Sequence, residues 1–356
     1  MSSSDSIPRI GRLPSGARDA ITDVPGVTVG HCTLDEGSVQ TGVTVVRPHG
    51  GDCFRDRVPA SSVVINGFGK SVGLMQVEEL GVLETPIALT NTYSVSVVAD
   101  AQIHACVAAN PGSGRDLPTV NSLVFECNDG YLNDIQRMVV GESHYREALA
   151  SAGPEFAQGS VGAGRGMSCF GLKGGIGSAS RRVKLAGGAE YTVGTFVLAN
   201  FGRLPNLTMA GRSIGDLVAS RLAASPAAGP EKGSIILLVA TDAPLDARQL
   251  RRLALRTSAG LARTGSVYGH GSGDIALAFS TAYTVPLETE RPMPSVAMLH
   301  DALLDPLFQA VADGTEQAIL HALWKATAVT GRDGHTRACL ARLLPDWPNL
   351  SERPQS

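Results

Sequence analysis

Gly269-His270-Gly271-Ser272-Gly273-Asp274 stands immediately before the apolar run Ile275-Ala276-Leu277-Ala278-Phe279. Glycine at alternate positions permits backbone conformations that other residues avoid, and it removes side-chain cover from Ser272. The apolar run predicts a buried strand beginning at Ile275, with Ser272 at its exposed N-terminal end. A serine there would become an N-terminal nucleophile if the chain were cut between Gly271 and Ser272. The six residues are equally typical of a glycine-rich hairpin that enters a strand, and a short motif alone does not separate the two interpretations.

Other apolar runs, rich in Val and Ile, predict further buried strands. They cover residues 43–46, 62–65, 123–125, 192–199 and 235–240. Helices are predicted between them, at residues 71–80, 94–109, 135–151, 246–264 and 309–328. Buried strands that alternate with helices predict a layered α/β architecture. No internal repeat or linker divides the chain, which predicts a single domain over residues 1–356.

The composition allows a large hydrophobic core. Of the 356 residues, 43% are hydrophobic and 18% are charged, and the formal net charge is −3. No run of Lys or Arg stands out, so we expect no nucleic-acid partner and no attachment to an anionic membrane surface. No stretch approaches the roughly 18 continuous apolar residues of a membrane span.

The cysteines and the first residues bear on the cellular compartment. The six cysteines are dispersed without a Cys-x-x-Cys spacing, which favours reduced thiols. Residues 1–8 are polar and lack the apolar segment of a secretory signal peptide. We therefore expect a cytoplasmic protein.

Three patterns that could indicate a cofactor or a metal are weak. The glycines of residues 67–73 lack the spacing of a dinucleotide-binding loop or a P-loop, so a tight turn between strand and helix is preferred. Residues 126–134 contain oxygen ligands but not the order of a calcium loop, and an Asn-Asp-Gly turn before a helix capped by Asn133 or Asp134 explains them. The eight histidines form no H-x-H or H-x-x-x-H pair that would suggest zinc. We expect neither a metal nor a cofactor.

Six sequence blocks, in order, give the chain a specific family resemblance. It resembles the L-aminopeptidase/D-esterases and β-peptidyl aminopeptidases, which are self-processing serine hydrolases, from about Arg9 to His335. The blocks are Ala20–His31, Thr41–Val46, Asn128–Asp134, Val161–Gly164 with Lys173–Gly177, Ala240–Leu245 and Gly271–Asp274. The resemblance implies a four-layer αββα sandwich similar to that of N-terminal-nucleophile hydrolases. It also implies cleavage between Gly271 and Ser272 into chains 1–271 and 272–356, and a homotetramer.

The implied chemistry begins with the chain itself. Ser272 Oγ attacks the carbonyl carbon of Gly271, and water opens the resulting ester. Ser272 then carries a free α-amine, whose ordinary pKa of about 7.7–8.0 suits a general base near neutral pH. The mature enzyme would form an acyl-enzyme with the N-terminal residue of a short peptide, amide or ester. His270 is not assigned the role of base, because neighbours on a strand point to opposite faces.

Further site residues follow from sequence position and from the resemblance. Asn200 ends the apolar segment 193–199 and could donate a hydrogen bond to the oxyanion, although an Asn before Phe201-Gly202 is also a common turn residue. In the family a hydroxyl–carboxylate pair supports the nucleophile. The matching residues here are Thr315 and Glu316, although glutamate on a helix is more often simply exposed.

The substrate-binding residues depart from the family pattern. Phe170 occupies the position of a tyrosine that helps to bind the oxyanion, and a phenyl ring has no donor. Gln158 replaces a glutamate suited to holding a substrate ammonium, and Glu155 lies near enough in sequence to substitute for it. The backbone at Gly164 could approach either the substrate or a neighbouring strand.

Two other functions share these features. One is an acyltransferase of the ornithine-acetyltransferase type, in which threonine typically stands where this chain has Ser272. The other is an uncleaved, non-catalytic binding protein on the same scaffold.

Overall fold

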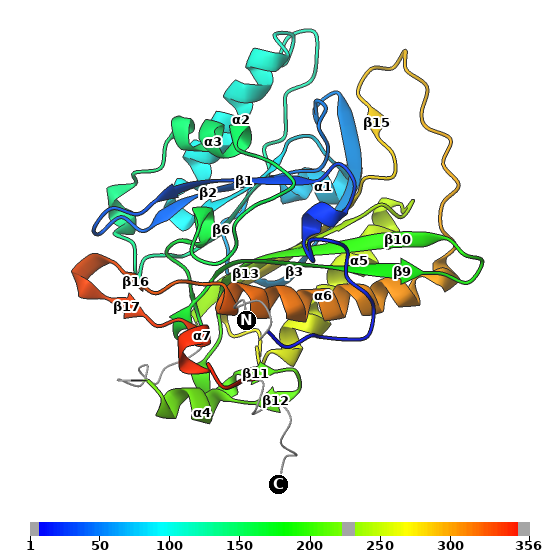
Figure 1. Ribbon diagram of the computed structural model, residues 1–356. Helices are drawn as coiled ribbons and strands as arrows, with labels where there is room; N and C mark the ends of the chain where they lie inside the picture. The colour runs from blue at the N-terminus through cyan, green and yellow to red at the C-terminus, as the bar shows by residue number, and fades with distance from the viewer. Residues whose placement is uncertain (1–6, 223–231, 348–356) are drawn as a thin grey trace.

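Two stacked β-sheets lie between two layers of helices (Figure 1). The computed structural model describes residues 7–222 and 232–347. The first sheet has the order β1-β2-β5-β6, formed by Thr28–Leu34, Thr41–Arg47, Ile87–Asn91 and Val124–Cys127. The second has the order β15-β3-β14-β13-β10-β9, formed by Val285–Pro286, Asp56–Gly67, Gly271–Ser280, Lys232–Thr241, Glu190–Asn200 and Gly175–Lys184, with β4 (Val82–Leu83) paired to β3.

Alternation along the central strands of the second sheet buries both of its faces. On β13, Ile236 and Leu238 contribute to the apolar cluster between the sheets, whereas Ile235 and Leu237 contribute to the cluster on the opposite face. Successive side chains of a strand point to opposite faces, so a strand covered on both sides reads as a continuous apolar run. The uninterrupted run of residues 235–240 therefore reflects burial between two layers.

Helices cover the outer face of each sheet. The helices α2 (Val95–Ala109) and α3 (Glu142–Ala150) pack on the first sheet around Tyr145, and α5 (Ala247–Arg263) and α6 (Asp305–Trp324) pack on the second sheet. The four layers confirm the predicted αββα sandwich. The remaining short elements are α1 (Leu74–Leu80), α4 (Gly215–Ser220), α7 (Leu340–Leu343), β7 (Ser168–Cys169), β8 (Leu172–Lys173), β11 (Thr208–Met209), β12 (Arg212–Ser213), β16 (Val329–Thr330) and β17 (Thr336–Arg337).

The strands predicted from apolar runs are confirmed, and two predicted helices are wrong in extent. The helix predicted over 309–328 is α6, which begins at Asp305 and ends at Trp324. Residues 135–151 are not a single helix: a 3₁₀ turn over Ile135–Arg137 is followed by a break before α3 begins at Glu142. Met138 adopts a left-handed conformation with φ of 45°, which ends the turn. Nor do Asn133 and Asp134 cap this turn as predicted, because Asn133 Nδ2 donates to Asp129 Oδ1 and Asp134 makes no side-chain cap.

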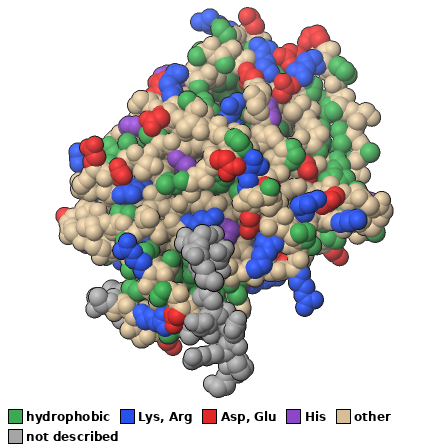
Figure 2. Space-filling model, viewed as in Figure 1, with side chains coloured by type: hydrophobic (Ala, Val, Ile, Leu, Met, Phe, Trp, Pro, Cys, Tyr) green, Lys and Arg blue, Asp and Glu red, His purple; other side chains and the backbone are tan. Residues whose placement is uncertain are grey.

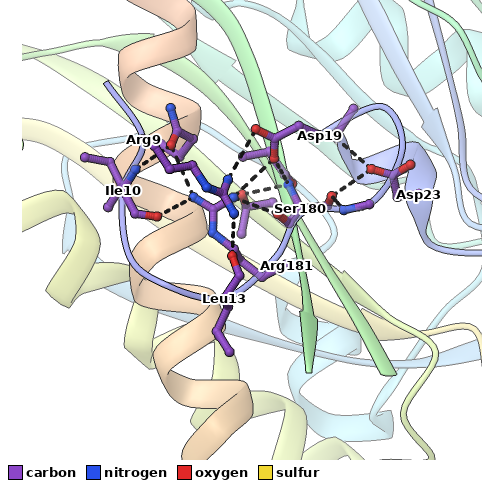
Figure 3. Close-up of polar contacts among 12 residues, drawn as sticks. Arg9, Ile10, Leu13, Asp19, Asp23, Ser180 and Arg181 are labelled. Carbon is purple, nitrogen blue, oxygen red and sulfur yellow. Dashed lines mark hydrogen bonds and ion pairs between the residues drawn. The ribbon is translucent and has the colours of Figure 1, made fainter. Parts of the chain in front are cut away.

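The N-terminal segment covers the free edge of β9 (Figure 3). Arg181 of β9 is fully buried and donates to the carbonyl oxygen of Ile10 at 2.8 Å and to Asp19 Oδ1 at 3.1 Å. Asp19 Oδ1 also accepts from the backbone N–H of Ser180 at 2.9 Å. Because an uncovered edge strand presents unpaired N–H and C=O groups, these contacts close the sheet on this side.

His321 of α6 belongs to the same buried polar region. Its Nδ1–H donates to the carbonyl oxygen of Ser178 at 2.6 Å, and its Nε2 accepts from Gln317 Nε2 at 3.1 Å. Burial lowers the pKa of His321 from 6.5 to about 4, so the ring is neutral at neutral pH.

Replacing His321 should change how stability depends on pH. Between pH 6.5 and pH 4 the unfolded chain binds a proton at this ring and the folded chain does not, so the free energy of unfolding falls as the pH is lowered. His321→Gln removes that contribution, which is at most about 2 kcal/mol between pH 6.5 and pH 5. The Tm advantage of the wild type over the variant should therefore be smaller at pH 5 than at pH 7. Replacing the exposed His300 by Gln is the control, and a pH-independent Tm difference for His321→Gln would contradict the prediction.

Candidate active site

One edge of the second sheet carries Asn200 and Ser272, two of the polar residues that the sequence singled out. Asn200 at the end of β10 pairs with Ser234 of β13, which pairs with Gly273 of β14 in parallel. Gly273 also pairs with Gly67 at the end of β3. Four adjacent strands therefore bring Asn200, Ser234, Gly273 and Gly67 to the same level of the sheet.

Ser272 lies inside this edge, which corrects its predicted exposure. The strand β14 begins at Gly271, four residues earlier than expected, because Lys232 and Gly233 of β13 pair beside Gly271 and Ser272. Ser272 is 0% exposed. The glycines before Ser272 do not expose it to solvent, because the backbone of neighbouring strands covers it.

Ser272 Oγ donates a 2.5 Å hydrogen bond to Asp274 Oδ1. Residues two apart on a strand share a face, so this pair lies on the same face as Ala276 and Ala278, which the helical layer of α5 and α6 covers. Asp274 is also 0% exposed. The buried hydroxyl–carboxylate contact is the most specific chemical feature of the edge.

Asn66 holds the backbone on both sides of the Gly271–Ser272 bond. Its Nδ2 donates to the carbonyl oxygens of Gly269 (3.0 Å) and Ser272 and lies 3.4 Å from that of His270. Phe68 N donates to the Ser272 carbonyl oxygen at 3.2 Å, and Ser272 N donates to Gly269 O at 2.9 Å. Sequence analysis missed Asn66, whose only signal was an amide directly after the apolar run 62–65.

Asn200 is buried at the same edge, but it points to the other face. It shares the inter-sheet face with Phe196 and Leu198. Its Nδ2 donates to the carbonyl oxygen of Asn128 at 2.9 Å, and its Oδ1 accepts from Ser168 N at 2.8 Å. With strands about 4.8 Å apart, its backbone is about 10 Å from that of Gly273. In this arrangement the amide bridges two backbone segments and does not contact Ser272.

Lys173 supports the loop that orients Asn200. Its side chain is fully buried, and its Nζ donates to the carbonyl oxygens of Gly164, Met167 and Gly174 at 2.8–2.9 Å. Burial lowers the pKa of this ammonium well below its usual value. The three bonds fix residues 164–168, from which Ser168 N reaches Asn200.

Phe170 and Gly164 are structural in this arrangement. Phe170 and Gly171 have φ of 53° and 72°, as in a type I′ turn between β7 and β8, and the buried phenyl ring packs edge-on against Phe201 at 5.1 Å. A Cβ at Gly164 would lie 2.6 Å from Ile176 N. Of the two expectations for Gly164, the structure shows the close approach to a neighbouring strand.

Gln158 and Glu155 are engaged away from Ser272. Gln158 Oε1 accepts from Ser178 N at 2.9 Å on the edge of β9. The Glu155 side chain is 79% exposed and pairs with Arg18 Nε at 2.5 Å. Neither contact leads to the edge where Ser272 lies.

Glu126 of β6 is a buried carboxylate that sequence analysis treated only as part of a turn. Its Oε1 accepts from Lys70 N at 2.8 Å and its Oε2 accepts from Thr92 Oγ1. A Cβ at Gly69 would lie 3.6 Å from Glu126 Oε1 and 3.8 Å from the Cα of Gly273. Glu126 Oε1 and Gly273 therefore both lie close to Gly69.

Thr315 and Glu316 belong to α6 and face α5. A Cβ at Gly260 would meet Thr315 Cβ at 2.7 Å, and Glu316 Oε2 lies 3.6 Å from Arg263 Nη1. Glu316 is buried, and its burial raises the pKa of its carboxyl group. The carboxylate in contact with Ser272 is Asp274, and the roles assigned to Thr315 and Glu316 stay predictions.

The surface and the remaining ionisable groups add little to the site. His270 is exposed, with its ring 6.1 Å from that of Phe68. Within residues 7–222 and 232–347, no cluster of three or more His, Cys, Asp or Glu side chains could hold a metal ion. No helix in these ranges is long and apolar enough to cross a membrane. On the face shown in Figure 2, basic and acidic side chains are interspersed.

Comparisons with known proteins identify the class. The profile of peptidase family S58 matches residues 19–337. The chain is 39% identical over 344 residues to the beta-peptidyl aminopeptidase BapA of Sphingosinicella microcystinivorans, covering 90% of this chain and 85% of that protein. Two solved structures are similar over almost their whole length. A beta-aminopeptidase of a Burkholderia species has a TM-score of 0.90 and 41% identity, with 99% of this chain and 100% of that one covered.

The L-aminopeptidase D-Ala-esterase/amidase of Ochrobactrum anthropi has a TM-score of 0.88 and 32% identity, with 98% of each chain covered. That structure is described as a prototype of the serine aminopeptidases and a variant of the Ntn hydrolase fold. The present chain is therefore a hydrolase of peptides and amides with an Ntn-type fold. It belongs to peptidase family S58.

Proposed function

We propose that this chain is a self-processing serine aminopeptidase and amidase that releases small N-terminal residues from short peptides, amides or esters. The observation that carries the proposal is the buried contact of Ser272 Oγ with Asp274 Oδ1, directly after Gly271. The names of the relatives support the reaction class. No observation favours the acyltransferase or the uncleaved binding protein over this function.

Processing would cut the single domain into chains 1–271 and 272–356. Ser272 Oγ attacks the Gly271 carbonyl carbon and the Gly271–Ser272 C–N bond breaks, so the acyl group moves from nitrogen to oxygen. Water then hydrolyses the ester. The hydrogen bonds from Asn66 Nδ2 to the flanking carbonyl oxygens support this step, because they hold the backbone close to the attacking hydroxyl.

Turnover would use the same hydroxyl with a new base. The α-amine of Ser272, freed by the cut, has an ordinary pKa of about 7.7–8.0 and can accept the Oγ proton near neutral pH. An acyl-enzyme with the substrate's N-terminal residue forms and is hydrolysed.

Asn200 is proposed as a donor to the oxyanion. Its Nδ2 now donates to Asn128 O and would have to exchange that acceptor for the substrate oxygen. The burial of its amide at the catalytic edge supports the role. For Thr315 and Glu316 we propose an indirect role, since Glu316 interacts with Arg263 at the end of α5, from which residues 264–270 lead into β14.

Glu126 is proposed as the group that holds the substrate's ammonium, in place of Gln158 and Glu155. Its burial near Gly273 supports this role, because a charged acceptor in a water-poor site binds an ammonium more strongly than an exposed one. Lys70 N and Thr92 Oγ1 fix the carboxylate but leave further acceptor positions on its oxygens.

We also propose a cytoplasmic homo-oligomer, a tetramer on the family resemblance. All six cysteines are free thiols, which suits a reducing compartment. Val64, Phe68 and Val267 expose more than half of their surface near the catalytic edge, which supports contact with another protein surface.

Substituting the nucleophile should abolish processing and hydrolysis together. Ser272→Ala removes the proposed attacking oxygen, so the purified chain should stay whole and inactive. Wild-type protein should give fragments 1–271 and 272–356 by mass spectrometry. Ser213→Ala, at an exposed serine on β12, is the control and should be cut normally. Normal cutting of Ser272→Ala would refute self-cleavage.

Removing the Asn200 amide should lower kcat. Asn200→Ala is expected to reduce kcat by about 10²–10³-fold, the usual loss for one oxyanion donor. Asn200→Asp keeps an acceptor for Ser168 N but no donor, so a similar loss there points to the oxyanion. Rates are to be normalised to the cleaved fraction, and folding is to be checked by circular dichroism. An unchanged kcat in folded, cleaved Asn200→Ala would make Asn200 a purely structural residue.

Recognition of a free amine can be assigned to one carboxylate. The wild type should hydrolyse an aminoacyl p-nitroanilide but not its N-acetylated form, with or without a chelator. Glu126→Gln should lower kcat/KM for the free amine by roughly 10–100-fold, the effect of losing one charge-assisted hydrogen bond. Glu155→Gln is the matched control and should have no effect. Equal turnover of the acetylated substrate would contradict aminopeptidase recognition, and a loss only in Glu155→Gln would transfer the role to Glu155.

A further inference from the structure

The hairpin of β16 and β17 lies at one side of the molecule (Figure 1) and packs against the segment that follows β6. Arg332, between the two strands, donates from Nε to the carbonyl oxygen of Gly130 at 2.7 Å. Its backbone N–H donates to the carbonyl oxygen of Leu132 at 2.8 Å. These contacts fix the position of the hairpin, whose last residue is Arg337.

Arg337 contacts both of the segments that hold Asn200. Its Nε donates to Ser168 Oγ at 3.1 Å, and its guanidinium carbon lies 3.5 Å from the centroid of the Tyr131 ring. Ser168 N donates to Asn200 Oδ1, and the carbonyl oxygen of Asn128 accepts from Asn200 Nδ2. The guanidinium and the Asn200 amide are therefore linked through a single residue, Ser168.

Within residues 7–222 and 232–347, no carboxylate forms an ion pair with Arg337. Its neighbour on the hairpin, Arg332, pairs with Asp333 Oδ2 at 2.6 Å. The Arg337 side chain is half-buried, and burial lowers the pKa of its guanidinium, with no carboxylate beside it to offset the effect. Arginine stays protonated at neutral pH, so a positive charge partly removed from water lies beside the site without a counter-charge.

A short peptide carries a matching anion, the carboxylate at its C-terminus, on the leaving-group side of the bond to be cut. The path from the Asn200 amide to Arg337 consists of two hydrogen bonds, of 2.8 and 3.1 Å, and one residue. An extended chain covers at most about 3.3–3.6 Å per residue, so a leaving group of two or three residues reaches that far. The flat guanidinium, stacked on Tyr131, has N–H groups in one plane, as a carboxylate requires.

We propose that Arg337 binds a carboxylate on the leaving group of peptide substrates, so that the enzyme prefers short peptides with a free C-terminus over their C-terminal amides. The inference rests on the proposed function, because it names a substrate group that the proposed site selects. Arg337 acts in binding alone and takes no part in the bond-breaking steps.

The direct test compares free acids with C-terminal amides. Trialanine and β-alanyl-dialanine are each offered as the free acid, as the amide, and as an amide with glutamate in the last position. Wild-type kcat/KM should be about tenfold or more higher for the free acid than for the amide, mostly through KM, as expected for one charge-assisted contact. In Arg337→Gln this ratio should fall to about one. In Arg337→Lys it should be intermediate, because an ammonium keeps the charge but loses the planar fork.

The glutamate amide distinguishes the two sources of a leaving-group carboxylate. Hydrolysis as efficient as that of the free acid supports binding of a side-chain carboxylate as well. Hydrolysis only as efficient as that of the plain amide supports binding of the C-terminal carboxylate alone.

Arg332→Gln is the matched control, because Arg332 lies on the same hairpin and contacts the same segment but already has a carboxylate partner. It should keep the wild-type ratio of free acid to amide. An aminoacyl p-nitroanilide, which has no carboxylate, measures any general loss of activity in each variant. An equal kcat/KM for free acid and amide in the wild type would overturn the proposal. So would an unchanged ratio in Arg337→Gln, or the same fall in Arg332→Gln. If the wild type hydrolyses neither the peptides nor the p-nitroanilide, the proposed function itself fails, whereas equal hydrolysis of acids and amides removes only the role of Arg337.

Discussion

The parallel pairing of β13 with β14 is the constraint on which the catalytic edge depends. It sets Gly233 beside Ser272 and Ser234 beside Gly273, and the antiparallel neighbours β10 and β3 then bring Asn200 and Asn66 to the same level. Parallel strands need a long crossover connection, and here α5 supplies the helical part of it. The position of Ser272 is therefore fixed by the packing of the crossover of residues 242–270, which contains α5, and not by the six residues of its motif.

Both faces of the second sheet are buried, and the polar residues of this edge lie on different faces. Ser272 and Asp274 lie on the face towards the helices, whereas Asn200 lies between the sheets with Asn128. Side chains on opposite faces can contact each other only at the edge of the sheet, because the hydrogen-bonded strands separate them elsewhere. Ser272 lies at the start of β14 and satisfies this condition, and in the structure its hydroxyl contacts Asp274.

The sequence predicted the layers better than it predicted the site. Long apolar runs such as 192–199 and 235–240 identify strands buried on both faces. A strand with one face in solvent would carry a polar residue at every second position, and these runs do not. The strand β9 was missed, since its Gly, Ser and Arg residues are buried through contacts with distant segments such as Ile10 and Asp19. The same limit applies to Ser272: its glycines are visible in sequence, whereas the backbone of β3 and β13 that buries it is not. Asn66 and Glu126 acquire their meaning only from contacts with segments that are distant in sequence.

Lys173 shows why some of these residues have no sequence signal. Burying an ammonium away from water costs free energy unless its N–H groups are hydrogen-bonded. Lys173 Nζ donates to three carbonyl oxygens of the loop around it. Those carbonyl oxygens point inward because glycines such as Gly164 let the loop approach β9 closely. The loop in turn presents Ser168 N to Asn200, so the buried Lys173 side chain helps to determine the orientation of the Asn200 amide. The partners of Lys173 and Asn200 are backbone groups, so the identity of the residues that contact them leaves no signal in the sequence.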